Sequence, residues 1–162
     1  MNTESKTKML IWIPVVLLPV ANMVLVCVND VNYEIYANMN LIIGAIAEEL
    51  FFRCFLLKNV LLDRTKIKPV IAIILVSVLF AAMHLWNLWS GQPPYQTFIQ
   101  MLFAFSFSIW AGAVTWKSTW LIPLVAHVLL NATAGEGNIW VSLAVSVLVI
   151  VDGLILMKEE RL

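Results

Sequence analysis

Charged residues are scarce in this sequence of 162 residues, and their scarcity excludes most classes of soluble protein. Only 12% of the residues are Asp, Glu, Lys or Arg, whereas 62% are hydrophobic. A soluble domain typically has about 25% charged and about 45–50% apolar residues. The formal net charge is zero, so no basic excess indicates a nucleic-acid partner. The apolar residues extend along nearly the whole chain, which indicates a protein of the lipid bilayer.

Six apolar stretches can each cross the hydrocarbon core, which requires about 17–25 helical residues. They lie at residues 9–28, 37–57, 69–89, 96–116, 119–134 and 138–157. The fifth is short, so we expect it to be tilted, kinked near Pro123 or partly re-entrant. Because the sequence shows no repeat and no linker, we predict one all-α transmembrane domain over residues 1–162, a polytopic helical bundle of about six spans.

The distribution of lysine and arginine predicts the orientation of the bundle. In a six-span arrangement, nine of the ten basic residues fall on one side, and the opposite side carries Asp30, Glu34 and Glu136. The nine are Lys6, Lys8, Lys58, Arg64, Lys66, Lys68, Lys117, Lys158 and Arg161. We therefore expect a multi-pass protein of the cell membrane with both termini in the cytoplasm.

The few cysteines and the main phenylalanine run are interpreted as packing residues. Cys27 and Cys54 lie in apolar stretches, so we expect small buried hydrophobic residues rather than a disulfide framework or a metal site. Phe103, Phe105 and Phe107 are expected to form a lipid-facing or packing surface.

The second predicted span carries three charged residues that a bilayer tolerates poorly. Glu48 and Glu49 are followed by Arg53, and each charge at the membrane centre costs roughly 2.5–3.5 kcal/mol on insertion scales. Glu49 and Arg53 are four residues apart, so they share a helix face and can pair. Glu48 points about 100° away from Glu49 and is left to exchange a proton. The structural alternative is a buried salt bridge that only orders the bundle.

Both histidines of the chain occupy predicted spans, each with an asparagine nearby on the same helix. His84 precedes Asn87 by three residues, and His127 precedes Asn131 by four. Histidine can act as an acid, a base or a metal ligand near neutral pH, and two donors aimed at one point can hold an oxyanion. Alternatively, His84 is an interfacial residue, and His127 and Asn131 are polar contacts between helices. Together, the three clusters favour activation of water for hydrolysis.

The three clusters resemble the motifs of the CPBP family, the CAAX-processing and bacteriocin-processing intramembrane endopeptidases, which include type II CAAX prenyl endopeptidases. That family has E-E-x-x-x-R, F-x-x-x-H and H-x-x-x-N on separate helices. Here they read Glu48-Glu49-Leu-Phe-Phe-Arg53, Phe80-Ala-Ala-Met-His84 and His127-Val-Leu-Leu-Asn131, within a core of about residues 37–135.

The resemblance implies an intramembrane peptidase with a peptide or protein tail as its substrate. Glu48 and His84 would activate the attacking water, and His127 with Asn131 would form the oxyanion hole. Glu49 and Arg53 would orient the site, while Phe80 would shape the substrate site, to which we add Asn87. We expect a glutamate-type enzyme without a cofactor, because H-E-x-x-H is absent.

Several alternatives remain open at the level of the sequence. If the enzyme depends on zinc, Glu48, His84 and His127 are the expected ligands. A non-catalytic member of the same family would act in bacteriocin self-immunity or partner binding. A small transporter or proton-relay subunit would also place glutamate and histidine inside the membrane, although no inverted repeat supports it.

Overall fold

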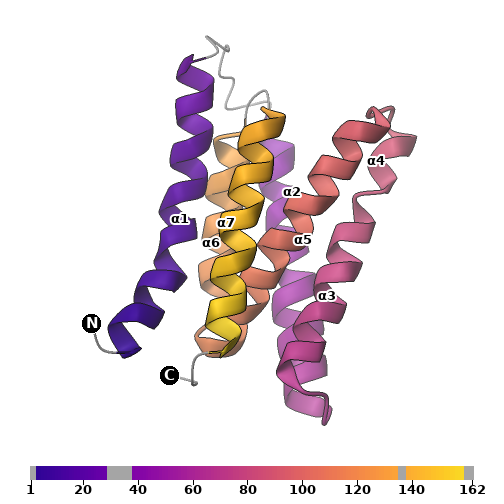
Figure 1. Cartoon of the computed structure of the whole chain (residues 1–162). Helices are drawn as coiled ribbons and strands as arrows, with labels where there is room; N and C mark the ends of the chain where they lie inside the picture. The colour runs from indigo at the N-terminus through magenta and orange to yellow at the C-terminus, as the bar shows by residue number, and fades with distance from the viewer. Residues whose placement is uncertain (1–2, 29–37, 135–137, 159–162) are drawn as a thin grey trace.

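A computed structural model describes residues 3–28, 38–134 and 138–158, and within these ranges the secondary structure is entirely helical. Figure 1 shows the helices packed side by side in one bundle. The elements are α1 (Thr3–Val28), α2 (Met39–Glu49), the π-helix η1 (Leu50–Leu62), α3 (Pro69–Met83), α4 (Trp86–Trp89), α5 (Pro94–Lys117), α6 (Leu121–Ala132) and α7 (Ile139–Lys158).

The outer surface of the bundle is apolar, as a lipid environment requires. Large hydrophobic side chains such as Val16, Val78 and Leu148 are more than half exposed, whereas soluble monomers seldom expose large contiguous apolar patches. Four segments are long and apolar enough to cross a membrane: Thr7–Cys27, Pro69–Trp89, Pro94–Lys117 and Ile139–Lys158. The prediction of an all-α membrane bundle is therefore confirmed.

The predicted second, third and fifth spans differ from the observed helices. The second is a helical run in which α2, of 11 residues, continues directly into η1, of 13 residues. The third is interrupted after Met83 by a turn at His84 and Leu85, before α4 begins. The fifth, α6, has only 12 residues, or about 18 Å at 1.5 Å per residue, which is less than a hydrocarbon core of about 30 Å. The total of six spans therefore stays a prediction.

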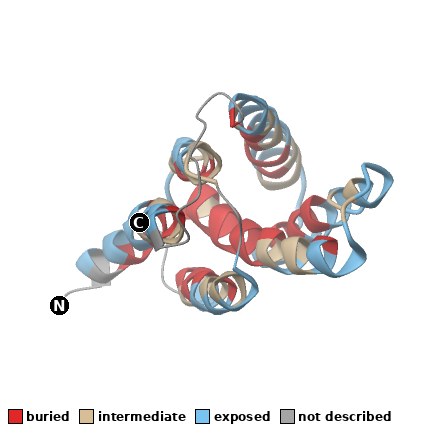
Figure 2. Cartoon of the chain, turned by 90° about the horizontal axis from the view of Figure 1, so that it is seen from above, coloured by how far each residue is buried: buried red, intermediate tan, exposed pale blue. Residues whose placement is uncertain are grey.

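Helix α5 forms the centre of the bundle, and Figure 2 shows its buried ribbon surrounded by the other helices. Two glycines allow close packing against it. A Cβ on Gly112 would lie 2.8 Å from Cγ2 of Ile73 on α3, and a Cβ on Gly153 of α7 would lie 2.8 Å from the backbone of Trp110. Small residues at such positions let helix backbones approach closely in membranes.

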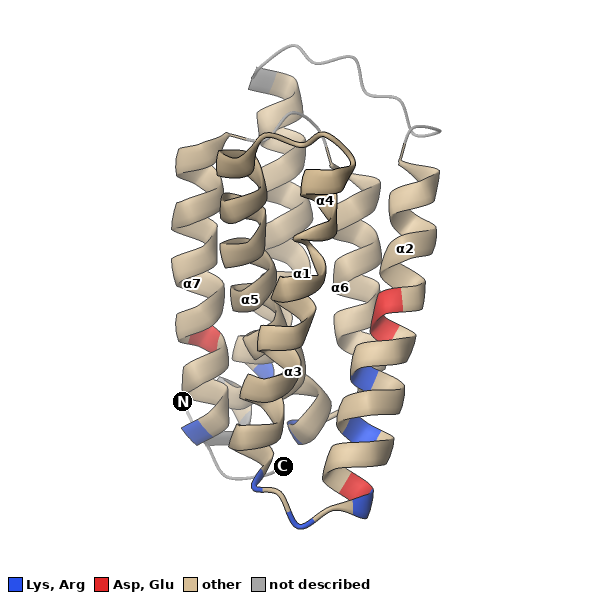
Figure 3. Cartoon of the chain, turned by 90° about the vertical axis from the view of Figure 1, so that its right-hand side faces the viewer, with Lys and Arg blue, Asp and Glu red and all other residues tan. Residues whose placement is uncertain are grey.

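The charged residues of the described chain gather toward one end of the bundle. Helix α1 begins and α7 ends at this end, where the loop between η1 and α3 also lies (Figure 1). Figure 3 shows Lys and Arg concentrated there. Two adjacent acidic residues lie near the middle of the continuous helical run that α2 and η1 form. Arg161, Asp30, Glu34 and Glu136, which we used to predict the orientation, lie outside the described residues.

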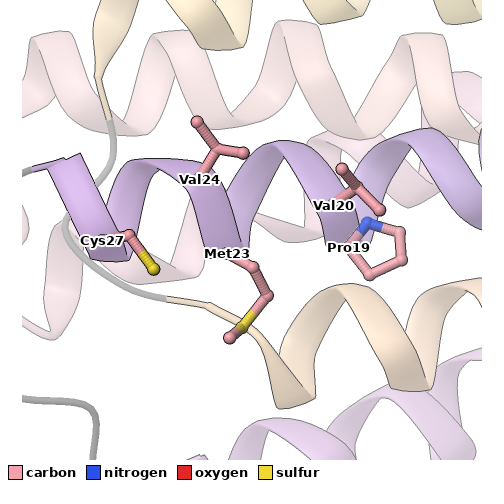
Figure 4. Close-up of a pocket in the computed structure, with 5 residues that line it drawn as sticks. All are labelled: Pro19, Val20, Met23, Val24 and Cys27. Carbon is pink, nitrogen blue, oxygen red and sulfur yellow. The ribbon is translucent and has the colours of Figure 1, made fainter.

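The outer face of α1 near its C-terminal end carries a shallow apolar hollow. Figure 4 shows its lining, which comes from this single helix: Pro19, Val20, Met23, Val24 and Cys27. The prediction that Cys27 is buried is wrong, because its side chain is exposed on this face. A thiol is apolar enough to face lipid, and an apolar stretch alone does not reveal which helix face points inward. Cys54 is partly buried.

Candidate active site

The two glutamates and the arginine lie where α2 passes into η1. Glu49 and Arg53 are completely buried, and Glu49 Oε2 lies 3.3 Å from Arg53 Nε in the predicted i, i+4 ion pair. Glu48 differs from its neighbour, because 39% of its side chain is exposed. The change from α-helical to π-helical hydrogen bonding follows directly after Glu49, and π-helical segments frequently occur at functional sites.

Helix α6 brings His127 against both glutamates. His127 Nδ1 lies 3.0 Å from Glu49 Oε1, and His127 Nε2 lies 3.8 Å from Glu48 Oε2. Only 9% of the His127 side chain is exposed. The imidazole is therefore held between a buried carboxylate and a partly exposed one, across 78 residues of sequence.

Phe80 of α3 lies at the centre of the cluster. Its ring centroid is 5.3 Å from that of His84 and 6.0 Å from that of His127. Arg53 Cζ lies 4.5 Å from the Phe80 ring centroid, a distance typical of cation–π contacts. Both histidines and the arginine thus contact one phenylalanine, which fixes their positions relative to each other.

Hydrogen bonds at Nδ1 determine where the ring protons of the two histidines lie. His84 Nδ1 is 3.0 Å from the backbone oxygen of Phe80, and a carbonyl oxygen can only accept. The Nδ1–H group of His84 therefore donates, and a neutral ring then carries its lone pair on Nε2. The same holds for His127 when Glu49, paired with Arg53, accepts from its Nδ1–H group. Both neutral imidazoles thus offer Nε2 as a base.

The two predicted asparagines have different surroundings. Asn131 lies one helical turn after His127, and its amide nitrogen donates to the backbone oxygen of Leu41 over 2.8 Å, linking α6 to α2. Asn87 of α4 donates to Gln100 Oε1 of α5 over 2.8 Å. The Asn87 backbone N–H group donates to the backbone oxygen of His84 over 3.0 Å, but within the described ranges no side-chain contact joins Asn87 to the carboxylate–histidine cluster of Glu48, Glu49, His84 and His127.

The geometry does not fit a metal centre within the part of the chain that the structure describes. No group of three or more His, Cys, Asp or Glu side chains is placed there to hold a metal ion. Zinc sites in enzymes use three protein ligands at about 2.0–2.3 Å. His84 and His127 both contact Phe80, and Glu48 approaches this group through His127 Nε2 at 3.8 Å.

Phe107 and Phe52 also belong to the site, although neither residue could be assigned to it from the sequence alone. Phe107 of α5 is buried with its ring centroid 5.1 Å from that of His127, and Phe52 of η1 packs 5.2 Å from Phe80. Phe107 is part of a phenylalanine run that we expected to be lipid-facing or packing surface. Because Phe107 is buried in the central helix α5, it belongs to the packing surface. Phe52 lies within the E-E-x-x-x-R motif itself.

Comparisons with known proteins identify the family of this chain. Neither the curated proteins nor the solved structures gave a match to the chain. Among protein families, residues 31–133 match the one described as type II CAAX prenyl endopeptidase Rce1-like. The matched segment covers more than half of the 162 residues and contains Glu48, Glu49, Arg53, Phe80, His84, His127 and Asn131. The chain therefore belongs to the type II CAAX prenyl endopeptidase Rce1-like family, a family of membrane proteases.

Proposed function

We propose that this protein is an intramembrane endopeptidase that hydrolyses a peptide bond in a peptide or protein tail with a water activated by Glu48 and the neighbouring histidines. The observation that carries the proposal is the pairing of Glu48 with His127 at 3.8 Å, while Glu49 holds the opposite face of the same imidazole at 3.0 Å. A base whose orientation is fixed by a third group is the arrangement found in many hydrolases.

The reaction begins when Glu48 takes a proton from a water molecule. Glu48 suits this role because its carboxylate is partly exposed, so water and substrate can reach it. The water oxygen attacks the carbonyl carbon of the peptide, and the carbonyl π electrons move to its oxygen. The proton then passes to the leaving nitrogen as the C–N bond breaks, which yields a carboxylic acid and an amine.

Histidine supports both halves of this reaction. His84 can assist Glu48, because its Nδ1–H group donates to the Phe80 carbonyl and its Nε2 is left as a base. When Glu48 passes the water proton to His127 Nε2, the resulting Nε2–H group can stabilise the oxyanion, as the family resemblance implies, and then give this proton to the leaving nitrogen. Asn131 can supply a second donor through the other hydrogen of its amide nitrogen, because only one hydrogen is donated to the Leu41 carbonyl. Glu49 and Arg53 act by positioning His127, since both are fully buried.

The experiment uses the purified full chain in lipid nanodiscs and internally quenched peptides that end in a CAAX sequence, with and without a prenylated cysteine. We expect cleavage, and Glu48→Gln should lower kcat by about 10²–10⁴-fold, the range for a lost general base. Asp63→Asn, which removes an exposed carboxylate at the end of η1, is the matched control and should cleave normally. Full cleavage by Glu48→Gln would refute the proposal.

The dependence on metal is tested on the same preparation. Because we route no step through a metal ion, treatment with a chelator followed by exhaustive dialysis should leave kcat unchanged. Elemental analysis of the active protein should find much less than one metal ion per chain. Loss of cleavage on chelation, with recovery on adding zinc, would instead assign Glu48, His84 and His127 to a metal centre.

A further inference from the structure

A cavity of about 910 Å³ lies next to the candidate active site, between α1, α5, α6 and α7. Binding sites for small ligands have volumes of about 300–1,000 Å³. The cavity lies toward the end of the bundle opposite the first residues of α1 and the last residues of α7 (Figure 1). Its described lining shares no residue with the apolar hollow in the outer face of α1 (Figure 4).

Two helices connect this cavity to the carboxylate–histidine cluster. Asn131 lines the cavity and lies four residues after His127 on α6, which is about 6 Å along the helix axis. Phe103 also lines the cavity, and its ring stacks at 6.5 Å on Phe107, the residue that contacts His127. A molecule bound against Asn131 in the cavity would thus lie about one helical turn from His127.

The polar lining that the structure describes consists of amides and hydroxyls, and none of these described lining residues is charged. Several amides are anchored at one end. Gln100 Oε1 accepts from Asn87 and Gln92, and Asn22 Nδ2 donates to the backbone oxygen of Leu130 at 3.0 Å. Their other ends, Gln100 Nε2 and Asn22 Oδ1, have no hydrogen-bond partner among the described residues.

These free ends give the cavity donors and acceptors without charge. Gln100 Nε2 can donate, while Asn22 Oδ1 and Asn131 Oδ1 can accept. A peptide backbone has the complementary pattern, one N–H donor and one carbonyl acceptor per residue. Charged groups would find no counter-ion here and would be costly to bury. Apolar walls such as Leu18, Phe103 and Val145 suit uncharged side chains.

We propose that this cavity binds an extended, uncharged segment of the peptide substrate through backbone hydrogen bonds to Asn22, Gln100 and Asn131. The inference rests on the proposed peptidase function and adds the site that selects the substrate. The cavity walls on α1 and α7 lie outside residues 31–133, the segment that matches the family. Two of the four helices that line the cavity therefore lie outside the segment that the family match covers.

The test measures binding without cleavage in the full-length Glu48→Gln chain. The probe is a short peptide of alanine and leucine with one photoreactive benzoylphenylalanine, acetylated at its N-terminus and amidated at its C-terminus. We expect cross-links to the cavity walls. Ala21→Trp and Ser142→Trp, which fill the cavity from different helices, should each lower the yield at least about tenfold. Val20→Trp, on the exposed face of α1, is the matched control and should not.

Three results decide the inference. A folded Ala21→Trp or Ser142→Trp chain that cross-links as well as the control would overturn the inference. A peptide probe that carries a lysine and a glutamate should label the cavity less than the uncharged probe, and equal labelling by the two probes would also overturn the inference. In the active chain, the filling substitutions should raise KM and leave kcat unchanged. Cleavage that persists in Glu48→Gln refutes only the role of Glu48 as the base, whereas undisturbed binding in either filled variant refutes only the cavity.

Discussion

The buried Glu49–Arg53 pair predicts a large and non-additive dependence of stability on each partner. Both side chains are completely buried, with Glu49 Oε2 3.3 Å from Arg53 Nε. Arg53→Leu leaves a carboxylate without its cation inside the bundle, and breaking a buried pair in this way costs about 3–5 kcal/mol. Glu49→Gln leaves the guanidinium unpaired and should cost a similar amount, although it keeps an oxygen that can accept from His127.

Removal of both charges should be less harmful than removal of either one. Replacing a buried ion pair with neutral groups is often close to neutral for stability, so the double variant Glu49→Gln/Arg53→Leu should cost less than either single variant and recover more than about 3–5 kcal/mol relative to the sum of the single variants. Unfolding by sodium dodecyl sulfate in mixed micelles, followed by tryptophan fluorescence, measures each free energy. Lys58→Leu, which removes an exposed charge from the same helix, should change it by less than about 0.5 kcal/mol. A coupling energy below about 0.5 kcal/mol between Glu49 and Arg53 would refute the pairing.

Two further predictions concern packing and orientation. Gly153→Ala should destabilise the bundle by about 1–3 kcal/mol in the same unfolding assay, because its Cβ would lie 2.8 Å from the backbone of α5. Gly44→Ala, which would meet nothing within 4 Å, should be neutral or stabilising by up to about 1 kcal/mol, and equal losses would contradict the close approach. In cells, Lys66→Cys should react with an impermeant maleimide only after lysis, and Gly91→Cys should react before it. The reverse pattern would place the termini outside.

Local relations in the site were predictable from sequence because helix geometry fixes them. Glu49 and Arg53 are one turn apart in the same helical run, so their pairing followed from spacing alone. The division between Glu48 and Glu49 followed in the same way, since consecutive helical residues point in different directions. The order of the three motifs similarly indicated which helices would contribute to one site.

Contacts between helices were not predictable in this way, because they depend on the rotation and depth of each helix. The bond between Glu49 and His127 joins residues 78 positions apart, and no spacing rule specifies it. Asn131 donates to the backbone oxygen of Leu41, a partner that sequence cannot single out because every residue carries a carbonyl. Phe107 could not be distinguished from Phe103 and Phe105 in the sequence, because what separates it from them is its burial and its ring contact with His127.

The division of roles between the two glutamates follows from burial as much as from position. A completely buried carboxylate that is fixed by Arg53 and His127 has no route to water, so Glu49 suits orienting a neighbour better than exchanging protons. Glu48, one residue earlier, keeps 39% of its side chain exposed and faces the other nitrogen of the same imidazole. The two glutamates thus hold His127 from opposite sides. Glu49 accepts from Nδ1–H and so fixes the tautomer, while Glu48 faces Nε2 and can exchange a proton with it. Because a carboxylate must meet water to activate it, the exposed member of the pair is the one that a peptidase would use as its base.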